Sequence, residues 1–514
     1  MSKTIIIIGA GLAGLSAALQ AAENGCNVKL VSSFPSERAQ SVMAEGGINA
    51  ALNTKDENDS PKEHFIDTIK AACGLADPNA VWGMTQAAPE LVHWLLKLGV
   101  QFNMSGYDDV DLRNFGGQKK KRTAFAQSDT GKQIMTAMID AVRRKEASGM
   151  VERFSHHSFL TLRLCDNICC GCVIRDEYSK ETVELPGDAV IVATGGMHGL
   201  FGNTTGSLSN TGEVTAELFR LGVPLANGEM IQYHPTTVKC GGKRMLISEA
   251  ARGEGGRLFA MKDGKQWYFM EEKYPELGNL MPRDITAREI WKVSHESEVF
   301  LDMTEISDEI ISNKLSGLAD DCMTYLHKDI RKEPVSVLPG IHYFMGGILV
   351  DEQHRTSIQN LYAAGECCAQ YHGANRLGGN SLLGALYGGR VAAKSACEQA
   401  DVVDLSCATQ IDFPPASQIS EIKQLNKVMQ ETMGVVRNEN TLLNGIQTIQ
   451  ALTGNLPLLG MAVLKSALAR KESRGAHWRE DYPKSNDDDY LKTTVARFDG
   501  KQIQISFVPV PERR

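Results

Sequence analysis

The N-terminal segment constrains the fold more than any other part of the chain. Residues 4–8 are apolar and β-branched, which is typical of a buried parallel strand. Gly9, Gly11 and Gly14 follow, then residues with helical periodicity and a second short apolar strand over 28–31. The first glycine permits the turn, the second lets a pyrophosphate approach the backbone, and the third lets helix pack on strand. The pattern predicts a Rossmann-type dinucleotide site with phosphates at the helix N-terminus.

Two later strand ends favour FAD over NAD as the dinucleotide. Residues 189–196 read as a buried strand that ends on a glycine turn, and residues 360–366 (N-L-Y-A-A-G-E) read as another. Glu366 could accept a hydrogen bond from a ribose or ribitol hydroxyl. A carboxylate usually binds ribose after the second strand, but Ser32 and Ser33 stand there, and serine hydrogen-bonds a hydroxyl less strongly.

Composition excludes several other classes of protein. The net charge is −8 and the one basic run, residues 119–122, is short, so nothing resembles a nucleic-acid footprint. The twelve cysteines match neither zinc nor iron–sulfur spacing, which predicts reduced thiols in the cytoplasm and no metal site. No transmembrane segment is expected, and the apolar N-terminus lacks the basic region and cleavage site of a signal peptide.

The middle of the chain carries cations flanked by glycines. His234 precedes a proline, and Arg252, Arg283, His342 and Arg376 lie in polar or glycine-containing stretches. Taken singly, such residues are more often structural than functional. Together they suit a small dianion held against a flat ring, because arginine binds carboxylates through two parallel hydrogen bonds.

At these residues nearly the whole chain resembles the flavoprotein subunit of succinate dehydrogenase and fumarate reductase, in a wider family that includes L-aspartate oxidase. The motifs that carry the resemblance are A-E-G-G-I-N-A-A-L (44–52), F-G-G-Q (115–118), S-E-A-A-R-G-E-G-G (248–256), P-R-D-I-T-A-R (282–288), H-Y-F-M-G-G-I (342–348), G-A-N-R-L-G-G-N-S-L-L (373–383) and S-R-G-A-H-W-R-E-D-Y-P (473–483).

The resemblance implies hydride transfer between flavin N5 and fumarate or succinate. It implies Arg283 as proton donor, with Glu249 and Arg252 as a proton relay. Implied substrate-binding residues are His234, Ser248, His342, Arg376, Phe115 and Gln118. Expected FAD-binding residues are Gly9, Gly11, Ala13, Gly14, Ser32, Gly46, Gly47, Ala193, Thr194, Gly195, Glu213, Glu366, Asn380, Ser381 and Leu382.

The expected fold class is α/β. We expect a Rossmann-like FAD-binding domain (1–230 and 346–400), interrupted by a capping domain (231–345). A helical C-terminal domain with a short terminal tail (401–514) should follow, its helical run broken at Pro457. The family likeness also implies a separate iron–sulfur electron-transfer subunit, through which the protein could be peripheral to the membrane.

The chain departs from the family at the flavin attachment site. Many members attach FAD to the histidine of R-S-H-T-V, where this chain has Gln40. Non-covalent FAD is therefore predicted, and losing the covalent bond should lower the flavin potential and favour fumarate reduction. Glu45 and Glu213 replace a common Gln and a common Asp.

Two alternative functions remain at this point. L-aspartate oxidase also lacks the attachment histidine, and residues 246–250 and 282–285 of this chain resemble that branch. The motifs F-G-G-Q, F-M-G-G and R-L-G-G-N-S instead resemble the dehydrogenase branch. A non-catalytic flavin-binding subunit is the other alternative. The presence of all four residues Arg283, His234, His342 and Arg376 argues against it.

Overall fold

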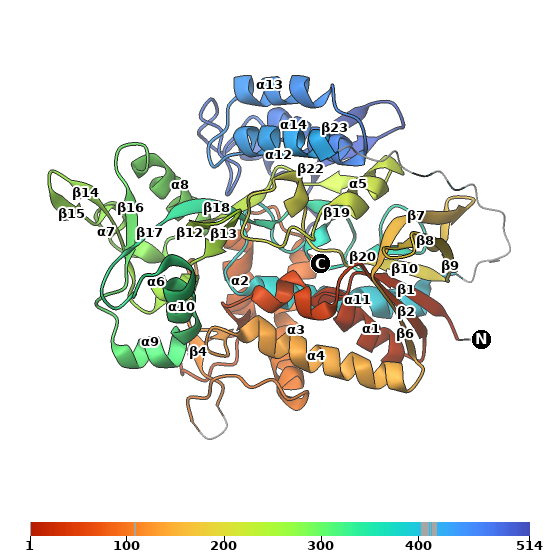
Figure 1. The fold of residues 1–514 in the computed structure, drawn as a ribbon, viewed down its shortest axis with the longest axis horizontal. Helices are drawn as coiled ribbons and strands as arrows, with labels where there is room; N and C mark the ends of the chain where they lie inside the picture. The colour runs from red at the N-terminus through yellow and green to blue at the C-terminus, as the bar shows by residue number, and fades with distance from the viewer. Residues whose placement is uncertain (1, 107–108, 402–410, 412, 414–418) are drawn as a thin grey trace.

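The computed structural model describes residues 2–106, 109–401, 411, 413 and 419–514. Figure 1 shows the N-terminal and central elements around one parallel sheet, a second group of strands and helices at the left, and the C-terminal helices along the top. The first group corresponds to the expected FAD-binding domain, and the α/β fold class is confirmed. The expected boundaries at 230, 345 and 400 stay predictions. Most of the segment just after residue 401 lies outside the described residues.

The central sheet has the order β20-β10-β1-β2-β6, and its strands pair in parallel. Its strands are β1 (Thr4–Ile8), β2 (Asn27–Ser32), β6 (Val151–Ser155), β10 (Ala189–Val192) and β20 (Leu361–Ala363). The two glycine-terminated strands expected from the sequence, β10 and β20, therefore lie on the same side of β1. Because parallel strands end at one edge, all three glycine turns come to that edge.

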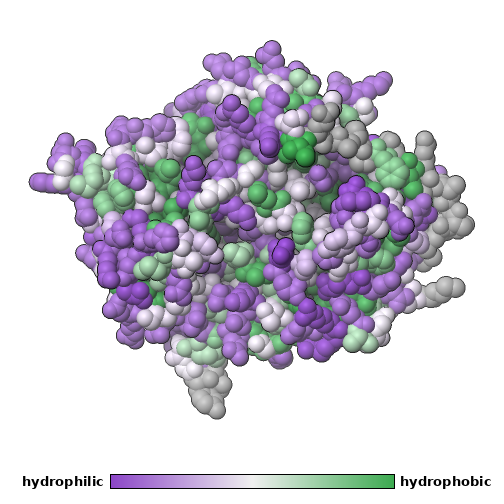
Figure 2. Space-filling model, in the orientation of Figure 1, coloured by the Kyte–Doolittle hydropathy of each residue, from purple (hydrophilic) through white to green (hydrophobic). Residues whose placement is uncertain are grey.

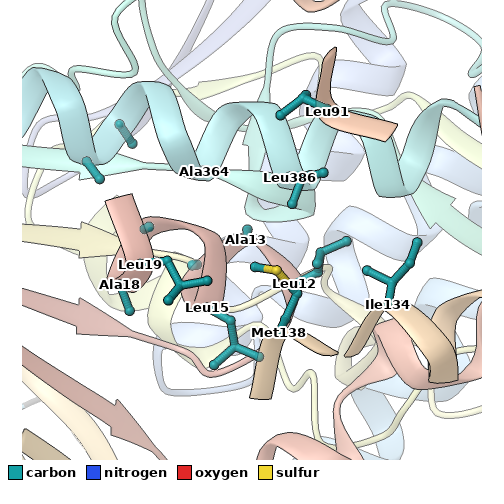
Figure 3. Packing of buried hydrophobic residues seen from close by; sticks show 14 of the residues in the cluster. Leu12, Ala13, Leu15, Ala18, Leu19, Leu91, Ile134, Met138, Ala364 and Leu386 are labelled. Atoms are coloured by element: carbon teal, nitrogen blue, oxygen red, sulfur yellow. The ribbon is translucent and has the colours of Figure 1, made fainter. Parts of the chain in front are cut away.

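Three helices pack together beside this sheet, and two of them, α1 and α11, bring their N-termini to the same edge. Helix α1 (Leu12–Glu23) packs along α11 (Asn380–Gln399), and α4 (Thr130–Ala147) packs on the other side of α1. Figure 3 shows Leu12, Leu15 and Leu19 of α1 among Leu386 and Met138. Full burial of each such side chain contributes roughly 1.5–3 kcal/mol.

The rest of this region consists of short elements around the main sheet. They are β3 (Ile48–Asn49), β4 (Leu112–Arg113), β5 (Thr123–Ala124), the antiparallel β7 (His157–Cys165), β8 (Ile168–Asp176) and β9 (Thr182–Pro186), β11 (Leu225–Ala226), β19 (Gly347–Leu349), β21 (Cys368–Ala369), α2 (Pro61–Ala71), α3 (Pro78–Lys97) and α5 (Glu213–Arg220). Three-residue to four-residue 3₁₀ helices η1 (Ser36–Arg38), η2 (Gln40–Met43), η3 (His198–Leu200) and η6 (Gly365–Cys367) lie between them.

The segment expected to form the capping domain contains two antiparallel sheets and short helices. Strands β12 (Ile231–Cys240), β13 (Lys243–Leu246) and β18 (Leu338–Phe344) form the first sheet. The second contains β14 (Arg257–Lys262), β15 (Lys265–Trp267), β16 (Val299–Asp302) and β17 (Val335–Ser336). The helices are α6 (Glu249–Gly253), α7 (Phe269–Lys273), η4 (Gly278–Leu280), α8 (Arg283–Val293), α9 (Asp308–Lys314), α10 (Ser316–Asp321) and η5 (Cys322–Leu326).

The C-terminal segment is helical, as expected, but two details differ from expectation. Pro457 does not break the helical run: it lies in the first turn of α14 (Asn455–Ala469), where its missing N–H costs nothing. The tail is a hairpin, β22 (Lys492–Phe498) and β23 (Ile503–Pro509), which adds to the sheet that contains β11. Helices α12 (Ile419–Thr432), α13 (Glu439–Ile449) and α15 (Asp487–Tyr490) complete the segment.

The cysteines differ from the expectation of uniformly reduced thiols. In the part of the chain that the structure describes, ten cysteines are free and Cys165 is disulfide-bonded. Among the described residues, no helix is long and apolar enough to cross a membrane, and no group of three or more potential ligands could hold a metal. On the face in Figure 2, hydrophobic residues lie in small separate groups between hydrophilic ones.

Candidate functional site

Two of the three glycines in the turn after β1 are required by close contacts within the protein, whereas the third faces open space. A Cβ on Gly9 would lie 2.3 Å from the carbonyl oxygen of Ala193, and a Cβ on Gly14 would lie 1.9 Å from that of Gly9. At Gly11 the nearest atoms would be 3.8 Å away. The protein itself therefore needs glycine at positions 9 and 14, while the open space beside Gly11 fits the approach of a pyrophosphate.

The end of β2 also fits a dinucleotide. The buried Ser32 Oγ has no hydrogen-bond partner among the described residues, and a ribose hydroxyl would supply one. The Leu12 N–H, at the start of α1, donates to Ser41 Oγ at 3.3 Å, which fixes η2 against the helix N-terminus. Gln40 begins η2, and its Oε1 accepts the Ser207 N–H at 2.5 Å.

Glu366 lies at the other end of this edge. Strands β20 and β2 are three positions apart in the sheet, which is about 14 Å. The Phe344 N–H donates to Glu366 Oε1 at 3.0 Å, and a Cβ on Gly365 would lie 2.8 Å from Cβ of Ala13. Burial raises the pKa of Glu366 to about 7. With ribose at Ser32, the ribitol of the same dinucleotide would reach Glu366; this contact stays a prediction.

The other expected FAD-binding residues divide into three groups. Gly46 and Gly47 precede β3, and a Cβ on Gly47 would meet the carbonyl of Ala124 at 2.5 Å. Ala193, Thr194 and Gly195 form the turn after β10, with Gly195 at φ +73°. Ser381 and Leu382 lie in the first turn of α11. Glu213 is exposed as the first residue of α5.

Two expected residues, Gln118 and Asn380, are tied into the protein interior. Gln118 Nε2 donates to Asn49 Oδ1 at 3.0 Å and to the Gly378 carbonyl at 2.9 Å. Asn380 Oδ1 accepts from Asn49 Nδ2 at 2.7 Å and lies 2.9 Å from Nε2 of His64. Both side chains therefore hold the N-terminus of α11 in place. Their partners Asn49 and His64 were not among the site residues predicted from the sequence.

The two histidines come together from neighbouring strands. His234 on β12 and His342 on β18 have ring centroids 5.1 Å apart, and His342 Nδ1 lies 2.8 Å from Oγ1 of Thr205. Burial, with Arg283 as the next contribution, lowers the pKa of both well below the ordinary value. Both imidazoles are thus neutral at pH 7, and each can donate one hydrogen bond.

Arg283 is the first residue of α8, and it forms an ion pair with Glu249, the first residue of α6. Its Nε and Nη2 donate to Glu249 Oε2 at 2.8 and 2.6 Å, and Arg252 Nη2 donates to Oε1 at 3.1 Å. Burial alone would raise the pKa of Glu249, but Arg283 and Arg252 outweigh it and hold the pKa below its ordinary value. Gly116 and Gly378 make room for this carboxylate, since a Cβ at either would lie within 2.8 Å of it.

Three more expected residues lie near this ion pair. Arg376 is buried over the ring of Tyr343 at 4.3 Å, and its Nε has no hydrogen-bond partner among the described residues. Burial and Arg283 lower its pKa to about 9. Ser248 caps α6 by accepting the Ala250 N–H at 3.4 Å. Phe115 is buried against Gly46, which places it between the expected flavin and substrate regions.

Gln232 is a site residue that the sequence analysis missed. Its Oε1 accepts from Arg283 Nη1 at 3.1 Å, and its Nε2 donates to Asn375 Oδ1 and to the Arg376 carbonyl at 2.9 and 2.8 Å. It thus links the two arginines. The only sequence signal was its position two residues before His234, on the same strand.

Family models match two parts of the chain. An FAD binding domain matches residues 4–382, and the C-terminal domain of the fumarate reductase flavoprotein matches residues 453–513. The succinate dehydrogenase flavoprotein subunit of Bacillus subtilis is 38% identical, over 100% of this chain and 98% of its own length. The 8-methylmenaquinol:fumarate reductase flavoprotein subunit of Wolinella succinogenes is 32% identical, over 100% and 92%.

Solved structures agree with this likeness. E. coli quinol fumarate reductase superposes with a TM-score of 0.89 at 26% identity, covering 99% of this chain and 97% of that one. A Mycobacterium smegmatis Sdh1 structure gives 0.84 at 29% identity, covering 100% and 95%. The chain belongs to the succinate dehydrogenase and fumarate reductase flavoprotein family of FAD-dependent oxidoreductases.

Proposed function

We propose that this protein reduces fumarate to succinate, using FAD held without a covalent bond. The observation that carries the proposal is the buried chain Arg283–Glu249–Arg252 beside two neutral histidines and Arg376. Bound FAD supplies the hydride from N5. The protein supplies the carboxylate contacts and the proton.

The substrate carboxylates are held by Arg376, His234, His342 and Ser248. Because burial keeps both histidines neutral, the positive charge that attracts a dianion comes from the arginines. Arg376 has an unused Nε donor for this purpose. Carboxylates held in this way polarise the double bond and make one carbon electrophilic.

The proton comes from Arg283. Arginine is a weak acid, so it can act only if the proton is replaced at once. Glu249 contacts two nitrogens of Arg283 and one of Arg252, which gives a continuous path for that replacement. Arg252 Nη1 donates to the Asn279 carbonyl at 2.6 Å, so the far end of the path is also fixed.

Two further features belong to the proposal. Gln40 cannot form the histidyl bond to flavin, so FAD should be released by acid, and its lower potential favours fumarate reduction. Electrons should come from a separate iron–sulfur electron-transfer protein, which could place the enzyme at the membrane periphery. Support for this partner comes from the family, whose solved members include quinol fumarate reductases.

The test is a pair of anaerobic mixing experiments on the purified enzyme. Dithionite-reduced enzyme should be reoxidised rapidly by fumarate, and oxidised enzyme should not be bleached by L-aspartate. Bleaching by L-aspartate followed by reoxidation in air would identify an L-aspartate oxidase instead. Acid precipitation should leave the yellow colour in the supernatant.

Replacing Arg283 tests the proton donor itself. We expect R283L to lower fumarate turnover by about 10²–10⁴-fold while FAD stays bound, because a positioned acid contributes this much. Arg288 lies on the same helix and stacks over Trp478 at 4.0 Å, away from Glu249. R288Q is therefore the matched control and should keep most of the activity. Equal rates for the two variants would contradict the role of Arg283.

A further inference from the structure

A second buried pair of titratable side chains, His198 and Glu366, lies near Arg376 and outside the Arg283 relay. His198, in η3, is fully buried and stacks edge-on against Phe344 with centroids 5.0 Å apart. Its Nδ1 lies 3.0 Å from Oγ1 of Thr204. Its Nε2 has no hydrogen-bond partner among the described residues and faces Glu366 Oε1 at 3.8 Å.

The surroundings of Glu366 suit a carboxyl group that gains and loses a proton near neutral pH. The charged or titratable groups that face it are Arg376, Tyr343, His198 and Cys367. Arg376 is a cation, but burial outweighs it, so the pKa of Glu366 is raised to about 7. Burial lowers the pKa of His198 to about 4, so this imidazole is neutral at pH 7.

The position of the pair points to the flavin ring. Glu366 accepts the Phe344 N–H, two residues after the clamp His342, and it faces the clamp Arg376. Hydride transfer requires the reactive part of the ring to lie next to the substrate clamps. Glu366 is thus at the ring end of the cofactor, opposite to Ser32.

We propose that Glu366, with His198 beside it, takes up a proton when the flavin is reduced. The proposal rests on the proposed placement of the flavin ring against the substrate clamps. Two electrons from a one-electron donor and one proton add a single negative charge to the buried ring. Glu366 balances that charge by taking a second proton from water, which converts its carboxylate to the neutral acid. His198 stays neutral, and its Nε2 faces this carboxyl group at 3.8 Å.

The alternative is that Glu366 only accepts a hydrogen bond from ribitol. Proton counting separates the two roles, because a hydrogen bond to a hydroxyl changes FAD affinity but not the protons taken up per electron. Above pH 7, where Glu366 is ionised in the oxidised enzyme, the proposed role adds one proton per two electrons. The midpoint potential should then fall by about 30 mV more per pH unit than without Glu366, since tenfold in equilibrium constant is 29.6 mV for two electrons.

The experiment is a redox titration of the FAD-loaded enzyme at several pH values, without substrate. Wild type should show the steeper slope above pH 7, and E366Q the shallower slope throughout. E23Q removes an exposed carboxylate at the far end of α1 and should match wild type. Identical slopes for wild type and E366Q would overturn the proposal.

A second measurement uses only wild-type enzyme, so its result does not depend on whether E366Q folds. Wild-type enzyme is reduced by dithionite at pH 8 in weak buffer with an indicator dye. The protons released by dithionite oxidation are measured separately with an electron acceptor that takes up no protons, and they are subtracted. About two protons per flavin are expected, and about one would overturn the proposal. Neither measurement uses fumarate. A failed fumarate turnover test would therefore refute the proposed reaction but would not change the number of protons counted per flavin.

Discussion

At the residue scale, the site depends on a few buried polar side chains that connect its charges. Gln232 shows this most clearly, because its amide accepts from Arg283 and donates toward Asn375 and Arg376. A buried donor or acceptor that loses its partner costs about 1–3 kcal/mol. Gln232 is therefore expected to position the proton donor without touching the substrate itself.

Replacing Gln232 by leucine should lower the kcat of fumarate reduction by about 10–100-fold, because one hydrogen bond to a charged group is worth about 1.5–3 kcal/mol. FAD content should stay near wild type. Q101L, at an exposed glutamine, is the control. A kcat within twofold of wild type would contradict the positioning role.

Residue type and local context carried the sequence signal for the site. The cations next to glycines were predicted to lie together, and the structure brings Arg283 close to His234, His342 and Arg376, while their roles stay predictions. Gln232, Asn49 and His198 were missed because their importance comes from contacts between segments far apart in the chain. Asn49 lies inside the 44–52 motif and Gln232 lies two residues before His234, but these neighbours do not show which distant residue each side chain contacts.

At the element scale, the strand–turn–helix–strand unit could be predicted from the sequence because each of its three glycines has its own structural role. Strands β1 and β2 and helix α1 have the expected order and nearly the expected bounds. The failure at Pro457 has an equally local cause. Proline ends a helix in its interior but is tolerated in the first turn, and the periodicity over this region does not show where α14 begins.

The glycines of the first turn give a matched pair of variants. A Cβ at position 11 meets nothing closer than 3.8 Å, so G11A should fold with nearly unchanged apoprotein stability but bind FAD at least tenfold more weakly. A Cβ at position 14 would lie 1.9 Å from the Gly9 carbonyl, so G14A should lose the folded state. Thermal unfolding of apoprotein and fluorimetric FAD titration check both. Unchanged FAD affinity in G11A would contradict the pyrophosphate assignment.

At the scale of the whole molecule, the capping segment closes over the FAD-binding region through a contact that carries excess negative charge. Glu45 directly precedes Gly46 and Gly47, which lead into β3, and its Oε2 is buried without a hydrogen-bond partner among the described residues. Asp321 of α10 and Asp129 at the start of α4 both face it, with Arg113 as a partly compensating cation. Burial, followed by Asp321, raises the pKa of Glu45 to about 8.

This pKa makes the stability of the closed molecule depend on pH. The folded protein keeps a proton on Glu45 between the ordinary pKa of 4.5 and about 8, whereas the unfolded chain releases it. Stability therefore falls as pH rises through this window. E45Q carries no titrating group, so its unfolding midpoint should exceed that of wild type by roughly 1–3 °C at pH 8 and match it near pH 5. The control D320N removes an exposed carboxylate of the same helix and should follow wild type at both values. Equal midpoints for wild type and E45Q at pH 8 would contradict the prediction. They would show that Glu45 is ionised in the folded protein and that Asp321 of α10 does not raise its pKa.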